Sequence, residues 1–295
     1  MWDHLQRWVS FCARRQVDPF SPHVNALLQF LYEAFQHGKQ DHSGLGYSSI
    51  NTIRSAISAV ASIDGQPAGQ HPLVRRFLKS VFQQRPALPR YNSTWDPNIV
   101  LDYLKTLGPN RLLTVLQLSR KLAFLMLLLS GHRCQLLHLL DTRNMDLTTS
   151  TAKFKIGDLL KTTRPGHHMS EVSFRAYAPD RRLCILTALT AYLRRTLESR
   201  GAVTQLFITS KPPYRAASRD SLRRWIRQLM VAAGIDINMF APHSIRSAVT
   251  SKAATTLPLM TILNTIGWSS SSTFTRYYNK PIKQQPIATA VLGDH

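Results

Sequence analysis

The chain has 295 residues, with 37 Lys and Arg against 16 Asp and Glu, so its formal net charge is +21. Only 18% of the residues are charged whereas 44% are hydrophobic, which excludes a disordered basic tail and indicates one large or two ordinary folded domains. A pI near 10.6 favours a polyanionic partner, with nucleic acid first and an anionic membrane surface second.

The apolar and cysteine patterns exclude two further classes of protein. The longest apolar run, residues 122–129, is far shorter than the roughly 20 residues that a helix needs to cross a bilayer. Three scattered cysteines without CxxC spacing, Cys12, Cys134 and Cys184, predict neither a disulfide framework nor a zinc site. We therefore expect a reducing compartment.

Residues 1–88 are predicted to form an all-helical domain. Apolar residues recur at helical spacing in segments 2–12, 24–35, 50–63 and 71–84. Two prolines, an asparagine and a serine then interrupt the periodicity within residues 84–95, which predicts a linker.

Residues 89–295 are predicted to form a second domain, mainly α with a small antiparallel sheet. Helices are expected at 98–107, 112–129, 184–198, 221–233, 243–254 and 257–266, and the apolar character of 112–129 on all sides predicts burial. Residues 146–175 are rich in Thr, Phe and Val, which favours strands, with a turn at 164–166. Net charge is +5 for residues 1–90 and +16 for residues 91–295. Both halves are thus expected to face the polyanion.

The most informative stretch is residues 241–280. Pro242 is predicted to open a helix whose first turn carries His243 and Arg246 on one face. A helix N-terminus attracts phosphate, and an imidazole with a guanidinium there makes an oxyanion-binding corner. Taken alone, the pair fits a polar helix start followed by an aromatic core segment better than it fits a site.

The wider set of residues resembles the C-terminal signature of the tyrosine recombinases, also called phage-type integrases. Its parts are His243 and Arg246, then Gly267-Trp268, then Tyr277-Tyr278. The resemblance also implies an earlier arginine after a buried helix, which is Arg133, and a lysine in a β-hairpin, which is Lys161, with Lys153 and Lys155 as nearby alternatives. The first 88 residues would then be a core-binding domain that clamps DNA.

A finer resemblance is to the recombinases of DIRS-type and Ngaro-type retrotransposons. It rests on HPLVRRFLKSVFQQRP, KTTRPG, HSIRSA and GWSSSSTFTRYYNKP. For such an element product in a eukaryotic cell we expect a nuclear location, and otherwise a cytoplasmic one.

The resemblance assigns a chemical role to each site residue. Arg133 and Arg246 would stabilise charge on the phosphate oxygens, and Lys161 would protonate the departing 5′ oxygen. His243 would assist proton transfer, and Trp268 would pack and donate its indole N–H where many relatives have His. A tyrosine would form the covalent phosphotyrosine. No metal or cofactor is implied.

Spacing leaves two candidates for the nucleophile. Tyr277 lies nine residues after Trp268, the usual interval in bacterial relatives, whereas Tyr278 lies 32 after Arg246, the usual separation from the HxxR motif. Retrotransposon relatives generally place an aromatic residue or His before the nucleophile. We therefore choose Tyr278, with Tyr277 as the alternative.

Further cations are predicted to bind DNA. They are Arg54, Arg75, Arg76 and Lys79 in the first domain and Arg223, Arg224 and Arg227 in the second. His132, His138, His167 and His168 lack accompanying carboxylates and are interpreted as surface or DNA-facing groups rather than metal ligands.

The resulting prediction is a site-specific DNA recombinase or integrase that acts through a 3′-phosphotyrosyl intermediate, as a homotetramer on double-stranded DNA and without a membrane. The alternatives are a non-enzymatic DNA-binding protein derived from such an element, or activity like that of a type IB topoisomerase. An RNA-binding protein is disfavoured because no RNP-like strand or GxxG loop is present.

Overall fold

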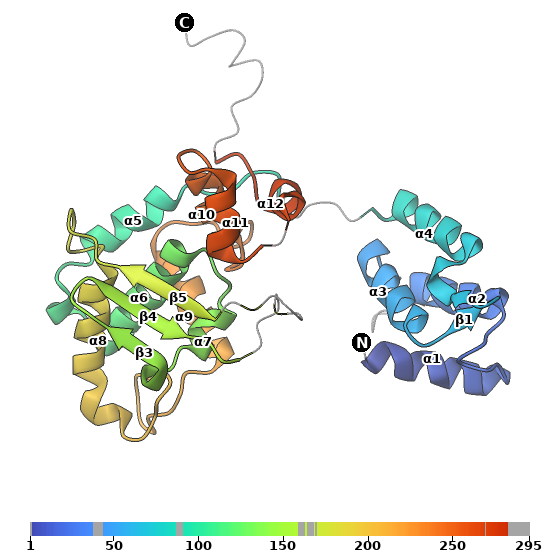
Figure 1. The fold of residues 1–295 in the computed structure, drawn as a ribbon, viewed down its shortest axis with the longest axis horizontal. Helices are drawn as coiled ribbons and strands as arrows, with labels where there is room; N and C mark the ends of the chain where they lie inside the picture. The colour runs from blue at the N-terminus through green and yellow to red at the C-terminus, as the bar shows by residue number, and fades with distance from the viewer. Residues whose placement is uncertain are drawn as a thin grey trace, which may run out of the picture. The chain divides into compact units, whose positions relative to one another are not determined.

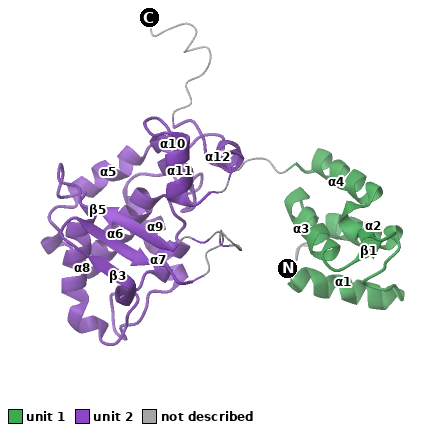
Figure 2. Ribbon diagram, in the orientation of Figure 1, with its two compact units in different colours: residues 1–90 green, residues 91–295 purple. Residues whose placement is uncertain are grey.

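The protein is described by a computed structural model that covers residues 2–37, 44–86, 91–158, 163, 168, 170–268 and 270–282. It divides into two compact units, residues 1–90 and 91–295 (Figure 2). The predicted domain boundary, between residues 88 and 89, lies outside the described residues. Within the described part of the chain, every helix is too short or too polar to cross a bilayer.

Unit 1 is built from four amphipathic helices. They are α1 (Trp2–Arg15), α2 (Val24–His37), α3 (Tyr47–Ser58) and α4 (Pro72–Gln84), with a short 3₁₀ helix, η1 (Ala68–Gln70), before α4. The core is aromatic where α1 meets α2, because Trp8 packs on Phe11 and edge-on against Phe30, with ring centroids 5.8 and 5.2 Å away. The predicted helical segments at 2–12, 24–35 and 71–84 are confirmed.

The segment predicted as one helix over residues 50–63 is wrong at its C-terminal end. Helix α3 ends at Ser58, and the chain enters a small hairpin of β1 (Ser62–Ile63) and β2 (Gln66–Pro67). Asp64 and Gly65 form its two-residue loop with φ angles of 51° and 73°. Such a loop needs positive φ at both positions, for which Asp-Gly is a preferred pair. The hairpin is a local addition to a helical unit.

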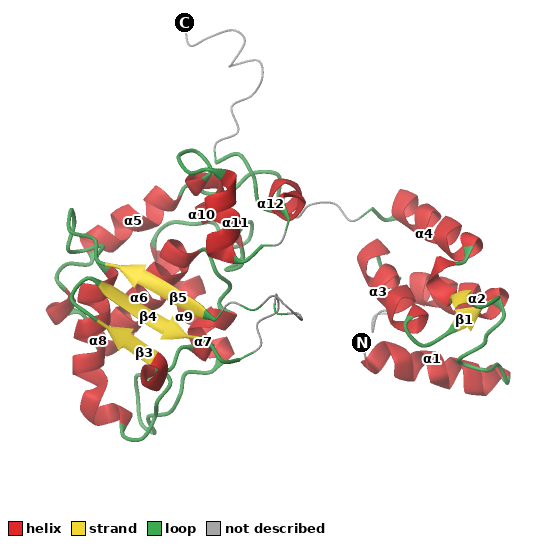
Figure 3. Ribbon diagram, in the orientation of Figure 1, coloured by secondary structure: helices red, strands yellow, loops and turns green. Residues whose placement is uncertain are grey.

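Unit 2 is mainly helical with one small sheet, which confirms the predicted fold class (Figures 1 and 3). Its helices are α5 (Pro97–Thr106), α6 (Val115–Ser130), α7 (Gln135–Leu139), α8 (Ile185–Arg200), α9 (Arg219–Ala232), α10 (Ser244–Ala253), α11 (Leu259–Ile266) and α12 (Ser271–Tyr277). Two 3₁₀ helices, η2 (Asn110–Leu112) and η3 (Thr142–Asn144), complete the helical part.

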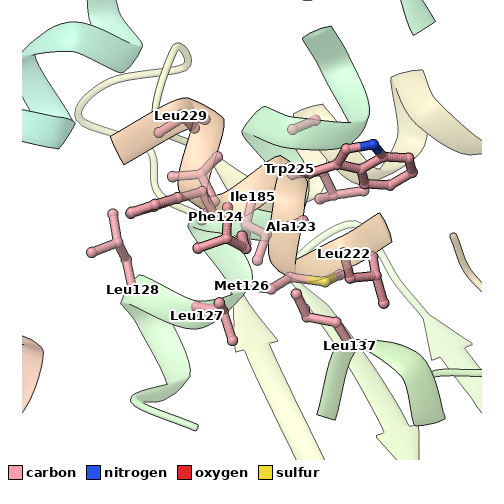
Figure 4. Close-up of a cluster of buried hydrophobic side chains, with 14 of the residues drawn as sticks. Ala123, Phe124, Met126, Leu127, Leu128, Leu137, Ile185, Leu222, Trp225 and Leu229 are labelled. Carbon is pink, nitrogen blue, oxygen red and sulfur yellow. The ribbon is translucent and has the colours of Figure 1, made fainter. Parts of the chain in front are cut away.

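Helix α6 is the centre of the core of unit 2. It contacts α8, α9, α10 and strand β5, and its side chains from Leu122 to Leu127 are almost completely buried (Figure 4). The helix begins at Val115 rather than at residue 112, because Thr114 and Gln117 form a capping box in which each side chain accepts from the other's amide.

The sheet is an antiparallel meander in the order β3 (Met145–Leu147), β4 (Thr151–Lys155) and β5 (Glu171–Arg175). Alternate residues face the core, so Ala152 pairs with Phe174 and Phe154 with Val172 on the buried side. The opposite face carries Lys153 and other exposed residues. The predicted turn at 164–166 lies outside the described residues.

The first and last described segments of unit 2 meet. The Thr94 amide donates to the Pro281 carbonyl at 2.9 Å, and the Lys280 ammonium donates to the Tyr91 carbonyl. Next to them, the Trp95 indole donates to Ser244 Oγ at 2.9 Å. The segment that opens the unit is thereby bound to helix α10 and to the segment after Tyr278.

Candidate functional site

Arg133 lies in the short turn between α6 and α7. Helix α6 ends at Ser130, and the residue that caps it, Gly131, has a φ of 63°. A Cβ at Gly131 would lie 3.0 Å from Cδ1 of Ile266 on α11. A glycine at this position therefore allows both the left-handed turn and the close approach of α11. The turn places Arg133 Nη2 at 3.3 Å from the hydroxyl of Tyr278, to which it donates.

Arg246 lies in the first turn of α10 and is only 3% exposed. Its guanidinium carbon lies 4.6 Å from the ring centroid of Trp268 and 5.3 Å from that of Tyr278. Its Nε and Nη2 atoms are buried and have no hydrogen-bond partner. Buried donors without partners are unfavourable, so these two are available to an anion.

The charge of Arg246 persists in this setting. Burial lowers the pKa of its guanidinium to about 10, with the nearby Arg133 acting in the same direction and Tyr278 opposing it. A pKa of about 10 keeps the group cationic at neutral pH. Two positively charged guanidinium groups therefore stand close to one phenol.

Helix α10 begins one residue later than the predicted range 243–254 and two residues after Pro242, which was expected to open it. Residues 241–243 form a tight turn in which the Ser244 amide donates to the Ala241 carbonyl at 2.8 Å, and the first helical residue is Ser244 rather than Pro242. His243 directly precedes the helix, is exposed, and lies with its ring centroid 6.3 Å from that of Tyr91. It therefore borders the site from outside while Arg246 lies inside it.

Trp268 and Tyr278 pack against each other in a tilted arrangement, and the Arg246 guanidinium lies over both rings. Their ring centroids are 4.6 Å apart at an interplanar angle of 35°. Trp268 is 7% exposed, and its indole nitrogen is buried without a hydrogen-bond partner. The indole thus packs as predicted and retains an unused donor.

The two adjacent tyrosines have different surroundings. Tyr278 follows the last residue of α12, is partly buried and has its hydroxyl bonded to Arg133. Tyr277 is 57% exposed, and the guanidinium carbon of Arg276 lies 5.4 Å from its ring centroid. The structure therefore brings Tyr278, and not Tyr277, to the two arginines.

Two serines that the sequence analysis did not single out hold the backbone of Tyr278. The hydroxyls of Ser247 and Ser251 each donate to its carbonyl oxygen at 2.8 Å. Both serines lie on α10 and are buried, with 2% and 5% of their surface exposed. The sequence signal that could have identified them is their spacing of four residues, which places both hydroxyls on one face of the predicted helix.

A pocket of about 420 Å³ opens beside the arginines. Its lining consists of His132, Arg133, Cys134, Gln135, Arg223, Ala241, Pro242, His243 and Arg246. None of these described residues is acidic, so the pocket is strongly electropositive. It brings together three of the predicted catalytic residues and adds Arg223, which was predicted only as a DNA contact.

His132 is not the surface or DNA-facing group that was predicted, because it is 7% exposed. Burial lowers the pKa of its imidazole to about 4, and the charges of Arg246 and Arg133 act in the same direction. The ring is therefore neutral at neutral pH. His138 is half-buried, with Nδ1 3.2 Å from the Ala217 carbonyl oxygen, whereas His168 is exposed. His167 lies outside the described residues.

Lys161 also lies outside the described residues, so its assignment stays a prediction. The two alternatives are on β4: Lys153 and Lys155 are exposed on the outer face of the sheet. Lys153 Nζ is 3.9 Å from Glu171 Oε1, a long surface ion pair.

Three of the four cations predicted to bind DNA in unit 1 border one pocket. Arg54, Arg75 and Lys79 line an open cavity of about 600 Å³ together with Asn51 and Gln70. Arg54 crosses Gly69 closely, since a Cβ at Gly69 would lie 2.4 Å from its Cδ. Arg76 borders a different, more apolar groove with Tyr32 and Phe77.

The three arginines of α9 that were predicted to bind DNA, Arg223, Arg224 and Arg227, are exposed, with Trp225 and Ile226 on the buried side as predicted. Arg223 lines the pocket beside Arg133 and Arg246. Its Nη1 lies 3.8 Å from Asp220, and Arg224 donates to Ser221 Oγ at 3.4 Å. Arg223 is thus the member of this group that the fold brings to the site.

The profile of the phage integrase family matches residues 104–284. The match covers more than half of the chain and includes both arginines, His243, Trp268 and Tyr278. The chain therefore belongs to the phage integrase family, which confirms the predicted superfamily. A search of curated protein sequences gave no match.

Several solved structures share the fold. The XerH site-specific recombinase bound to palindromic difH substrate, in a post-cleavage complex, has a TM-score of 0.54 at 13% identity over 91% of this chain and 71% of that one. The Tn1549 transposon integrase in complex with transposon right end DNA has a TM-score of 0.54 at 14% identity over 91% and 83%. A lambda integrase dimer bound to a COC′ core site has a TM-score of 0.51 at 12% identity over 95% and 89%. At these identities the likeness is one of fold.

Proposed function

We propose that this protein is a DNA recombinase that cleaves and rejoins strands through a covalent 3′-phosphotyrosyl bond to Tyr278. The observation that carries the proposal is the convergence of Arg133, Arg246 and the Tyr278 hydroxyl, with Arg133 donating to that hydroxyl at 3.3 Å. A nucleophile beside two fixed cations is the arrangement that phosphodiester cleavage requires.

The proposed reaction balances without an external energy source. The Tyr278 hydroxyl loses its proton to a base or to water as its oxygen attacks the scissile phosphorus, the bond from phosphorus to the 5′ oxygen breaks, and the departing oxygen takes up a proton. The products are a 3′-phosphotyrosine and a free 5′ hydroxyl. Attack by a 5′ hydroxyl on the phosphotyrosine reverses the step and joins strands.

Each side chain contributes to this reaction by its position. The free donors of Arg246 and the guanidinium of Arg133 would bind the non-bridging oxygens, whose charge grows in the transition state. The unused indole N–H of Trp268 would add a neutral donor. His243, exposed at the rim, would contact the phosphate from the solvent side, and Lys161 is proposed as the acid for the 5′ oxygen.

The test is the trapping of a covalent adduct. The purified chain is incubated with a pool of nicked duplexes of randomised sequence, in which the short fragment between the scissile phosphate and the nick diffuses away after cleavage. We expect a denaturation-resistant protein–DNA adduct that Tyr278→Phe abolishes and that Tyr277→Phe, the matched control, retains. Loss with Tyr277→Phe but not Tyr278→Phe would transfer the role to Tyr277. Binding to the pool without any adduct would favour a non-enzymatic DNA-binding protein.

We further propose that the chain acts as a homotetramer on double-stranded DNA. The lambda integrase relative was solved as a dimer on its core site, which supports multimeric action within this fold. Strand exchange between two duplexes needs a multimer, whereas relaxation of supercoils by a topoisomerase-like activity needs one protomer. Sedimentation of the protein with nicked duplex, together with a relaxation assay, separates the two.

The origin in a DIRS-type or Ngaro-type retrotransposon and a nuclear location are proposals that rest on the sequence segments alone. A fluorescent fusion of the chain expressed in eukaryotic cells tests the location. A cytoplasmic signal would count against it.

A further inference from the structure

The segment that carries the proposed nucleophile contains two adjacent tyrosines. Neighbouring residues at a helix end point in different directions, so only one of the two can meet the arginines in a given backbone register. Helix α12 has 7 residues and ends at Tyr277. The Tyr278 amide still donates to the Phe274 carbonyl at 2.8 Å, so it is the Tyr278 carbonyl that is left to contacts from outside α12.

Ser247 and Ser251 supply those contacts from a different helix. Both hydroxyls donate to the Tyr278 carbonyl oxygen at 2.8 Å, which occupies both of its lone pairs. Ser251 Oγ also accepts from the Lys280 amide at 2.9 Å. Helix α10 therefore binds two consecutive peptide units of the tyrosine segment, through the Tyr278 carbonyl and the Lys280 amide.

The same helix carries Arg246, which the proposed function assigns to the non-bridging oxygens of the phosphate. Arg246 immediately precedes Ser247, and all three side chains are buried. The distance between the Arg246 guanidinium and the Tyr278 phenol is therefore set by α10 and by the three hydrogen bonds that its serines make to the tyrosine segment. Catalytic groups held in this way keep the narrow geometry that reaction requires.

We propose that Ser247 and Ser251 are positioning residues that fix the register of the tyrosine segment and so select Tyr278 over Tyr277 as the nucleophile. The proposal rests on the proposed function. Without the two hydroxyls, the Tyr278 carbonyl and the Lys280 amide lose their partners on α10, while the hydrogen bonds of Lys280 and Pro281 to Tyr91 and Thr94 remain. We expect the residues before Lys280 then to shift so that Tyr277 moves toward Arg133.

The experiment measures which tyrosine carries the adduct. Ser247→Ala/Ser251→Ala is made in the otherwise unaltered chain, in a Tyr277→Phe background and in a Tyr278→Phe background, and each is incubated with the nicked duplex pool. We expect adduct formation through Tyr278 to fall about 10- to 100-fold, as for a displacement of roughly 1 Å. In the Tyr278→Phe background we expect a new adduct through Tyr277, mapped by mass spectrometry of the phosphotyrosyl peptide.

Thr250→Val is the matched control. Thr250 is a buried hydroxyl residue of the same helix, but it donates to the Arg246 carbonyl at 2.7 Å and not to the tyrosine segment. We expect it to leave the choice of tyrosine unchanged. Thermal unfolding is recorded for every variant, and the single variants Ser247→Ala and Ser251→Ala replace the double variant if that one does not fold.

The outcomes separate the two proposals. An adduct through Tyr278 in the unaltered chain, with no Tyr277 adduct in any serine variant, overturns the role of the serines, whatever happens to the rate. An unaltered chain that forms no adduct overturns the proposed function and the serine role with it. A Tyr277 adduct that appears equally with Thr250→Val also overturns the serine role.

Discussion

The two units place positive charge in opposite surroundings. In unit 1, Arg75 and Lys79 are exposed at an open pocket of about 600 Å³. In unit 2, Arg246 is 3% exposed and stacked on aromatic rings beside a pocket of about 420 Å³. Both pockets are therefore positively charged, but the side chains in unit 1 are exposed to solvent whereas Arg246 in unit 2 is held in place by its neighbours.

This difference separates the cations that we expect to contribute to DNA affinity from those that we expect to contribute to the proposed chemistry. Exposed lysines and arginines bind phosphate by releasing counterions, so their contribution depends on salt. A buried guanidinium with a fixed orientation is prepared to stabilise charge that develops in a transition state. We therefore expect variants of the two pockets to change different measurements.

The largest expected effect concerns the independence of the two cores. Phe124→Ala removes a fully buried ring from α6, and we expect it to reduce the free energy of unfolding of unit 2 by about 3–5 kcal/mol. Trp8→Ala, at 0% exposure in the other core, should destabilise unit 1 by a similar amount. Denaturant titration measures the loss of unfolding free energy in each variant, and limited proteolysis shows which unit has become less stable. Equal protection changes in both units would show that they unfold together.

The next effect separates chemistry from affinity. Arg246→Ala should slow adduct formation by about 100- to 1000-fold, because two buried donors to the phosphate are lost. Arg227→Ala, an exposed arginine on α9, serves as the control and should change the rate little. Single-turnover rates at saturating protein give the comparison. Equal losses would remove the distinction between buried and exposed cations.

A third prediction concerns pH. The pKa of His132 is about 4 in the folded protein and ordinarily about 6.5, so between these values the unfolded chain binds a proton that the folded chain does not. Stability is therefore lost as the pH falls below 6.5. At pH 5 the loss is at most about 2 kcal/mol relative to pH 7. Denaturant titrations at both pH values should show this loss in the unaltered chain and not in His132→Gln.

The smallest effect belongs to unit 1. Arg75→Ala/Lys79→Ala should lower the slope of log affinity against log salt by about 2, with little change in adduct rate at saturating protein. Arg76→Ala, one position further on α4 but at a different groove, should leave the slope unchanged. Binding measured from low to high salt tests both. A reduced slope with Arg76→Ala would mean that the DNA covers more of α4 than the pocket.

The sequence was sufficient for elements that periodicity defines. Helix α6 is apolar on all sides and is buried, and alternate residues of β4 and β5 face the core. The Asp64-Gly65 loop was visible in the sequence as a turn pair but was hidden by the apolar run before it. Local patterns thus predict elements better than they predict where one ends.

The residues of the candidate site could be predicted mainly from motif spacing and from the resemblance to the tyrosine recombinases. Tyr278 was preferred over Tyr277, and the structure brings it to Arg133. Ser247, Ser251 and the burial of His132 were not predicted, because each depends on contacts with segments far along the chain. Helical periodicity gives the face of a residue on its own helix but not the segment that will cover that face.

The contact between the two described ends of unit 2 has a mechanical consequence. Thr94 is bound to Pro281, and Tyr91 to Lys280, so the unit is a ring of chain closed by hydrogen bonds. Tension between residues 91 and 282 loads this closure before it reaches the apolar core. These hydrogen bonds involve residues two and three positions after Tyr278. A pulling force on the two ends of unit 2 would therefore act on contacts next to the proposed nucleophile before it acts on the core.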